Sequence, residues 1–149
     1  MNKLLLILTL TVFAFHSCTK EDNPPTPPIE KTPEELLTAH SWRIQELRWV
    51  DQGILYHYQR GIPGNGDIVA NEAIQFNADK TGKTHDNTPL TWEFMDAAKT
   101  KLKFTINFPT GPVIVNWEHM VIKESSLTYA EFWTRPTGPS VGFGTRIPL

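Results

Sequence analysis

The residue with the most definite chemistry in this sequence is Cys18, the only cysteine among the 149 residues. It follows Ser17 at the end of an apolar run, Leu4 to Phe15, which starts just after the positive charge of Lys3. A bilayer-spanning helix needs about 20 apolar residues, so this run is too short to cross a membrane and fits the centre of a signal peptide. A small residue directly before a cysteine is what lipoprotein signal peptidases require. We therefore predict a signal peptide over residues 1–17 and a lipid on Cys18; a chance cysteine in an ordinary signal peptide is the alternative.

A proline-rich segment over residues 18–32 separates this cysteine from the rest of the chain. Its four prolines favour an extended polyproline II tether, which is expected to be disordered. Within it, Lys20, Glu21 and Asp22 resemble the surface-export signal of lipoproteins in some Gram-negative bacteria, a lysine and two acids close to the lipidated cysteine. The resemblance implies an outer-membrane protein held at the cell surface by its lipid. A solvated linker without a signal, or a Pro-x-x-Pro recognition motif, would explain the same residues differently.

Few other residues are spaced for catalysis or metal binding. No nucleophile elbow, phosphate-binding loop, dinucleotide-binding glycine motif or His-Glu-x-x-His motif occurs, so the sequence predicts no cofactor and no metal site. Glu118 and Glu131 would suit a general acid and base if both pointed into a barrel, but carboxylates on solvated strand faces are the simpler interpretation. We therefore expect a protein that is not an enzyme.

Aromatic side chains are the one feature that suggests a ligand. An eight-stranded barrel has room inside for one small molecule, and apolar pockets lined by aromatic rings suit such ligands. The alternative is that these rings simply fill the core. The candidate ligand-binding residues are Trp49, Tyr56, Tyr58, Trp92, Phe104 and Trp117.

Short amphipathic strands dominate residues 33–149. Residues 32–35 carry a capping box with proline at the first helical position, which predicts a short helix from Pro33 to about His40. After it the apolar residues recur with a period of two, which is typical of half-buried strands. A change of parity between Ile44 and Leu47 predicts a β-bulge there. The predicted strands cover residues 41–50, 54–59, 73–77, 83–88, 90–95, 101–108, 113–122, 127–134 and 141–147.

The composition fits one domain that is stabilised by packing alone. Cleavage before Cys18 would remove a single basic residue and leave 13 Lys and Arg against 16 Asp and Glu, a net charge of −3. This mildly acidic balance lacks the basic surface typical of nucleic-acid binding. No cysteine would remain for disulfides, but residues 33–149 are numerous enough to bury a self-sufficient core.

The order of several sequence blocks resembles the lipocalin-like domains of bacterial outer-membrane lipoproteins. The pattern comprises a first-strand tryptophan, Trp42, a Phe-Asn-x-Asp-x-x-Gly hairpin at residues 76–82, a later strand with Trp92, and two strands joined by a polar turn at residues 123–126. The resemblance implies an all-β fold, an antiparallel up-and-down β-barrel of about eight strands with a short N-terminal helix. A β-sandwich is the alternative.

The family pattern also assigns the two ends of such a barrel. It implies that Trp42 closes one end, covered by an arginine from a late strand, and Arg135 and Arg146 are the candidates. Trp49, towards the far end of the same strand, would then line the open mouth.

Three classes of function follow. The leading hypothesis is a lipid-anchored, non-catalytic module that captures a small apolar ligand or a glycan fragment outside the membrane. The second is a structural or interaction lipoprotein whose solid barrel docks on an unknown protein partner of the cell envelope, and the third is an enzyme. A barrel cavity of roughly a few hundred Å³ or more would favour the first, and a filled interior with an exposed aromatic patch would favour the second.

Overall fold

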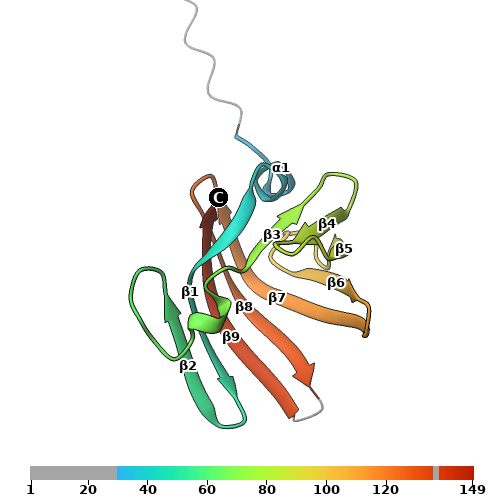
Figure 1. The fold of residues 1–149 in the computed structure, drawn as a ribbon. Helices are drawn as coiled ribbons and strands as arrows, with labels where there is room; N and C mark the ends of the chain where they lie inside the picture. Colours follow the sequence, from blue (N-terminus) through green and yellow to red (C-terminus); the bar gives the residue numbers. More distant parts are fainter. Residues whose placement is uncertain (1–29, 136–137) are drawn as a thin grey trace, which may run out of the picture.

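The computed structural model describes residues 30–135 and 138–149, and antiparallel strands make up most of them (Figure 1). Cys18 and the export residues Lys20, Glu21 and Asp22 lie outside the described residues. The elements are α1 (Pro33–Thr38), β1 (Ser41–Asp51), β2 (Ile54–Gln59), the 3-10 turn η1 (Asp67–Val69), β3 (Ala73–Phe76), β4 (Thr81–Thr84), β5 (Pro89–Phe94), β6 (Leu102–Phe108), β7 (Gly111–Lys123), β8 (Ser126–Arg135) and β9 (Gly138–Pro148).

Eight of the strands close into a barrel. Strands β3 to β9 follow one another in the sheet, and β1 pairs with β3 on one edge and with β9 on the other. Closure leaves β1 and β9 without the unpaired edges that an open sheet would expose. The ninth strand, β2, is an addition to the barrel that pairs with the second half of β1. The predicted all-β barrel with a short N-terminal helix is therefore confirmed.

The bulge predicted in the first strand is present. The register of β1 against β9 shifts between Ile44 and Glu46, so one extra residue enters β1 at this point. The shift lets Trp42 and Ile44 before the bulge, and Leu47 and Trp49 after it, all point to the inner side, where each is buried.

The inner side carries two hydrophobic clusters. In the barrel itself Phe76 packs edge-on against the rings of Trp92, Phe104 and Trp117, with ring centroids 5.7–5.8 Å apart. The second cluster lies where β1 and β2 extend beyond the short strands, and it contains Ile44, Leu47, Trp49, Tyr58 and Val69. Residues of the first cluster are Leu37, Trp42, Ile74, Phe76, Leu90, Trp92, Leu102, Phe104, Val115, Trp117, Met120, Leu127 and Tyr129.

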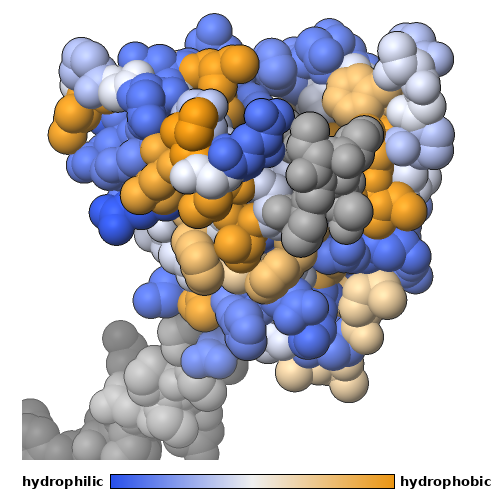
Figure 2. All heavy atoms as spheres, turned by 90° about the horizontal axis from the view of Figure 1, so that it is seen from below, coloured by the Kyte–Doolittle hydropathy of each residue, from blue (hydrophilic) through white to orange (hydrophobic). Residues whose placement is uncertain are grey.

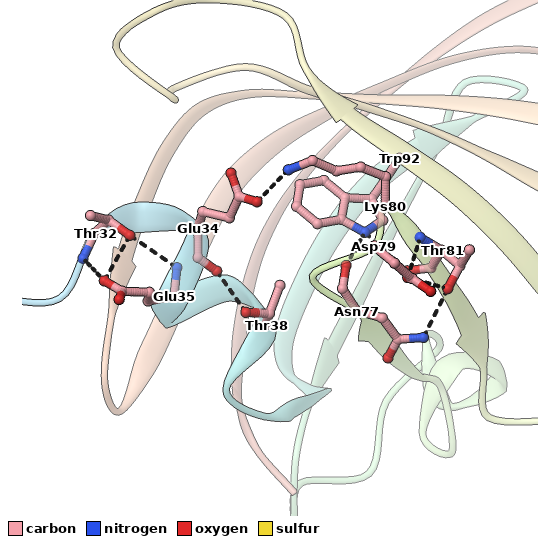
Figure 3. Close-up of polar contacts among 9 residues, drawn as sticks. All are labelled: Thr32, Glu34, Glu35, Thr38, Asn77, Asp79, Lys80, Thr81 and Trp92. Atoms are coloured by element: carbon pink, nitrogen blue, oxygen red, sulfur yellow. Dashed lines mark hydrogen bonds and ion pairs between the residues drawn. The ribbon is translucent and has the colours of Figure 1, made fainter.

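Helix α1 closes one end of the barrel (Figures 1 and 3). Its predicted capping box is present, with Thr32 and Glu35 exchanging hydrogen bonds. Leu37 is fully buried, and its carbonyl accepts a hydrogen bond of 2.8 Å from Nε1 of Trp42. Lys80 ties the helix to the β3–β4 hairpin, because it pairs with Glu34 while its ammonium lies 4.1 Å from the centre of the Trp92 ring. The helix therefore covers this end of the barrel, with Leu37 and Trp42 buried beneath it.

The Phe-Asn-x-Asp-x-x-Gly segment proves to be a structural device of this end of the barrel (Figure 3). Nε1 of Trp92 donates to the carbonyls of Asn77 and Thr81, both at 3.0 Å, so the indole fastens the turn. Asp79 accepts from the backbone N–H and the hydroxyl of Thr81. A side chain at Gly82 would collide with the carbonyl oxygen of Gln75.

Two local expectations differ from the structure. The strand expected over residues 83–88 ends at Thr84, because Asp86 accepts hydrogen bonds from the Thr84 hydroxyl and the Thr88 N–H and turns the chain. These bonds hold the pKa of Asp86 down, at about 2. A second bulge, unpredicted, lies in β7 between Glu118 and Val121, where His119 adopts φ +53°. Among the described residues, no helix has the length and hydrophobicity needed to span a bilayer.

Candidate ligand-binding site at the barrel mouth

A cavity of about 170 Å³ opens at the end of the barrel opposite α1. Figure 2 shows the molecule from this end, where hydrophobic surface interrupts the hydrophilic surface. The cavity has an apolar part, formed by β6 and β7, and a polar part, formed by the residues before β3, the turn after β4, and strands β8 and β9. Its principal lining residues are Phe104, Ile106, Phe108 and Val115 on the apolar side and Glu72, His85, Asp86, Glu131 and Arg146 on the polar side.

Arg146 is a buried cation beside this cavity. It is 5 % exposed, and its Nε donates to the hydroxyl of Tyr129 at 2.9 Å while Nη1 donates to the carbonyl of Trp42 at 3.2 Å. Its Nη2 lies 3.9 Å from a carboxylate oxygen of Glu72, and its guanidinium carbon lies 5.3 Å from the centre of the Trp117 ring. A buried guanidinium needs such compensation because removing a charge from water is costly.

The hydrogen-bonded group around Arg146 extends through Tyr129 to Trp117 and Glu131. The Tyr129 and Trp117 rings are stacked with their centroids 4.0 Å apart, and Nε1 of Trp117 donates to Glu131 at 2.6 Å. Burial raises the pKa of Tyr129 well above its usual range, although the adjacent charge of Arg146 acts in the opposite direction. The phenol is therefore neutral at physiological pH.

Glycines of β9 make room for these rings. A Cβ at Gly144 would lie 2.5 Å from the Tyr129 ring, and one at Gly142 would lie 3.3 Å from Trp133. Neither Gly142 nor Gly144 has a positive φ. Glycine is therefore required here because a larger residue would not fit, and not because of the backbone conformation. Sequence reasoning missed this signal, which was visible as Gly142-Phe143-Gly144 in a predicted strand.

The six candidate ligand-binding residues belong to, or pack against, the two hydrophobic clusters. Trp49 stacks on Tyr56 with ring centroids 5.0 Å apart, and Tyr58 belongs to the same second cluster. Trp92 and Trp117 are 3 % and 0 % exposed inside the barrel. Phe104 is the one of the six that lines the mouth cavity. Most of these rings thus fill the interior, as the alternative interpretation proposed.

Arg146 reaches Trp42, but not by stacking on its indole. It bonds to the backbone carbonyl of Trp42, while the rings beneath the guanidinium are those of Trp117 and Tyr129. The Trp42 indole is instead tied to α1 through Leu37. The side chain of Arg135, the other candidate, lies outside the part that the structure describes.

Glu118 and Glu131 point to opposite sides of the sheet. Glu131 shares the inner side with Trp117, whereas Glu118 pairs with Lys101 on the outer side at 3.2 Å. The two carboxylates therefore do not form an acid–base pair. In residues 30–135 and 138–149, no three His, Cys, Asp or Glu side chains gather as metal ligands.

Comparison with protein-family models, with curated proteins and with solved structures gives no match for this chain. Its function is therefore inferred from its residues and their geometry.

Proposed function

We propose that this protein is a lipid-anchored, exported lipoprotein whose lipocalin-like barrel is a non-catalytic module that binds a small ligand at its mouth. The observation that carries the proposal is the cavity beside Arg146, which combines an apolar side with buried hydrogen-bonding groups. Pockets that recognise small molecules have this combination, because apolar surface supplies affinity and a few polar groups fix orientation.

The volume limits the ligand to a small group. A cavity of about 170 Å³ is smaller than the few hundred Å³ expected of a barrel that encloses its ligand, and it falls below the roughly 300–1,000 Å³ of sites for drug-sized molecules. It is comparable to an apolar cavity of about 150 Å³ that accepts benzene. We therefore propose that one ring of a small apolar ligand or of a glycan enters the mouth, with its apolar face against Ile106 and Phe108 and its polar substituents towards Glu131 and Arg146.

The membrane anchor in this proposal rests on the sequence. Ser17 and Cys18 supply the cleavage and lipidation chemistry, and Lys20, Glu21 and Asp22 supply the proposed route to the outer face of the outer membrane. Stable attachment to a bilayer takes two signals, such as two acyl chains, because a single chain binds only marginally.

A titration of the amide resonances with phenol and with methyl β-glucoside tests the mouth site. One of the two probes should shift residues around the mouth in a saturable way. Ile106→Phe should abolish these shifts, because Ile106 is half-buried and lines the cavity. Asn107→Phe is the matched control, since Asn107 is exposed on the next position of β6 and does not line the cavity. Equal responses of the two variants, or no response to either probe, would contradict the proposal.

A solid barrel that docks on an envelope protein is the second candidate, and the exposed apolar side chains favour it. On the outer side of the sheet Val50, Val141 and Phe132 are register partners across β1, β9 and β8, and Leu55 extends the row onto β2. Phe143 beside this row is 61 % exposed. Contiguous exposed apolar surface is typical of interaction sites.

Site-specific photocross-linking in intact cells tests this second candidate. A photoreactive residue at Phe143 should give one discrete protein adduct, whereas the same residue at exposed Asn107 on β6 should not. Adducts of equal yield at both positions would argue against a docking surface.

A further inference from the structure

Arginine and lysine side chains gather in a hollow of about 400 Å³ on the outer wall of the barrel. Arg43 of β1 and Lys83 of β4 contribute, and Arg60 reaches it from the segment after β2. Ser41, Gln75 and His85 are further lining residues, and the lining contains no Asp or Glu. The hollow adjoins the mouth cavity near Thr84, but these three cations line the hollow alone.

The three cations of the hollow differ from most of the other described cations in their ion pairing. Among the described residues, no carboxylate forms an ion pair with Arg43, Arg60 or Lys83. Carboxylates do pair with most of the other described cations, namely Lys31, Arg48, Lys80, Lys101, Lys103 and Arg146. The lining of this hollow is thus basic, although the chain as a whole carries a net charge of −2.

Arg43 has an unmet hydrogen-bonding requirement. Its Nε is buried and has no hydrogen-bond partner within the described part of the chain. A buried donor without an acceptor is unfavourable, and for a charged group the cost is larger. A negatively charged group in the hollow would lower the cost of keeping the Arg43 guanidinium without a carboxylate partner, and it would reduce the repulsion among the cations.

Arg60 is held in position for such a ligand. Its Nε donates to the carbonyl of Ile44 at 2.9 Å and its Nη2 to the carbonyl of Ala70 at 3.0 Å, so the guanidinium is fixed by backbone groups. Lys83 is held less tightly, by one bond of 3.2 Å to the side chain of Asn87. A preorganised guanidinium loses little conformational entropy when it binds an anion.

We propose that this hollow is a second binding site, which takes a small phosphate ester. Guanidinium groups match the oxygen geometry of phosphate, and three cations suit the three terminal oxygens of a doubly charged phosphate monoester. The volume exceeds that of the bare ion and leaves room for the group that carries it. The site is independent of the proposed mouth ligand.

The test is an amide-resonance titration with inorganic phosphate, glucose 6-phosphate and glucose, at constant ionic strength. Ser41 and Gln75 are reporters because they line the hollow but not the mouth cavity. Glucose 6-phosphate should shift the resonances of Ser41 and Gln75 saturably, with a higher affinity than inorganic phosphate. Glucose should not shift them. Arg43→Gln and Lys83→Gln should each weaken binding about tenfold or more, since each removes one charge-assisted contact. Raising the salt should weaken binding too.

Lys123→Gln is the matched control. Lys123 is exposed, forms no ion pair with a described residue and lies outside the hollow, so its loss removes the same charge without touching the site. Binding by this variant should equal that of the unmodified protein. The proposal is overturned if Arg43→Gln and Lys83→Gln, with unchanged melting temperatures, bind glucose 6-phosphate as Lys123→Gln does, or if no probe shifts Ser41 and Gln75.

Discussion

At the scale of single residues, the centre of the barrel is organised by one charge. Arg146 bonds to Tyr129 on β8 and to Trp42 on β1, and it faces Glu72 before β3. These partners belong to separate segments, so their bonds hold the seam where the barrel closes. A buried polar network of this kind stabilises the fold only while each of its polar groups keeps its hydrogen-bond partners.

Tyr129→Phe should change how stability depends on pH. The folded-state pKa of Tyr129 is raised by burial above the value near 10 of an unfolded tyrosine. Above about pH 10 the unfolded state therefore loses this proton more readily, and stability falls as the pH rises. Urea melts from pH 8 to 11 should show a smaller alkaline loss in Tyr129→Phe than in the unmodified protein. Tyr56→Phe, a change at a half-buried ring of the second cluster, should retain the full loss; an equal reduction in both variants would rule out Tyr129 as the source.

The two tryptophans of β1 should differ in their contribution to stability. Trp42→Ala should cost about 3–5 kcal/mol, the range for emptying a buried aromatic site. It also removes the bond to Leu37 at the α1 end. Trp49→Ala should cost less, because Trp49 packs at the other end against the half-buried Tyr56. A pair of urea melts decides the order, and greater damage by Trp49→Ala would mean that the second cluster contributes more to stability than the α1 end does.

At the scale of elements, spacing within β9 decides whether the rings of β8 fit. Gly144→Ala should destabilise the protein by about 1–3 kcal/mol, the usual cost of overpacking, because the new methyl group would displace the Tyr129 ring from Trp117. Gly142→Ala meets a more distant ring, that of Trp133, and should cost less. Thermal melts of the two variants make the comparison. If they are equally stable, the close approach at Gly144 does not limit packing.

Strand β1 was predictable because its inward positions are all large and apolar, so the bulge appears in the sequence as a break in parity. The bulge in β7 was not predictable, because the residues around Glu118 and His119 have no regular apolar alternation that a bulge would interrupt. Closure through Arg146 was only partly predictable. Residues 42 and 146 are 104 positions apart, and the identity of the ring under the guanidinium depends on packing that no local pattern encodes.

The placement of ligand residues shows the same limit. Counting aromatic rings indicated an apolar interior, but whether rings leave a cavity depends on how they interlock. Phe76 was not among the expected ligand residues, yet its contacts with three other rings fill the space that a larger ligand would need. The polar half of the mouth was likewise missed, since Glu72 and Arg146 meet only through the closure of the sheet.

At the scale of the whole molecule, the proposed attachment to the membrane depends on one side chain, that of Cys18. Cys18→Ala should abolish acylation and move the protein out of the washed membrane fraction, because no other cysteine is present to carry the lipid. Replacing Lys20, Glu21 and Asp22 with alanine should leave it in the membrane but shield it from protease added to whole cells. Fractionation and protease shaving measure both. An unchanged membrane fraction for Cys18→Ala would refute lipid anchoring.

The proposed binding role is tested most directly by native mass spectrometry of the acylated protein purified from its own membrane. The unmodified protein should carry an additional non-covalent mass, and Asn107→Phe should retain it. Ile106→Phe should lose it, because the new ring occupies the mouth cavity. The bare acylated mass in the unmodified protein, or the same additional mass in Ile106→Phe, would contradict a ligand-binding barrel mouth.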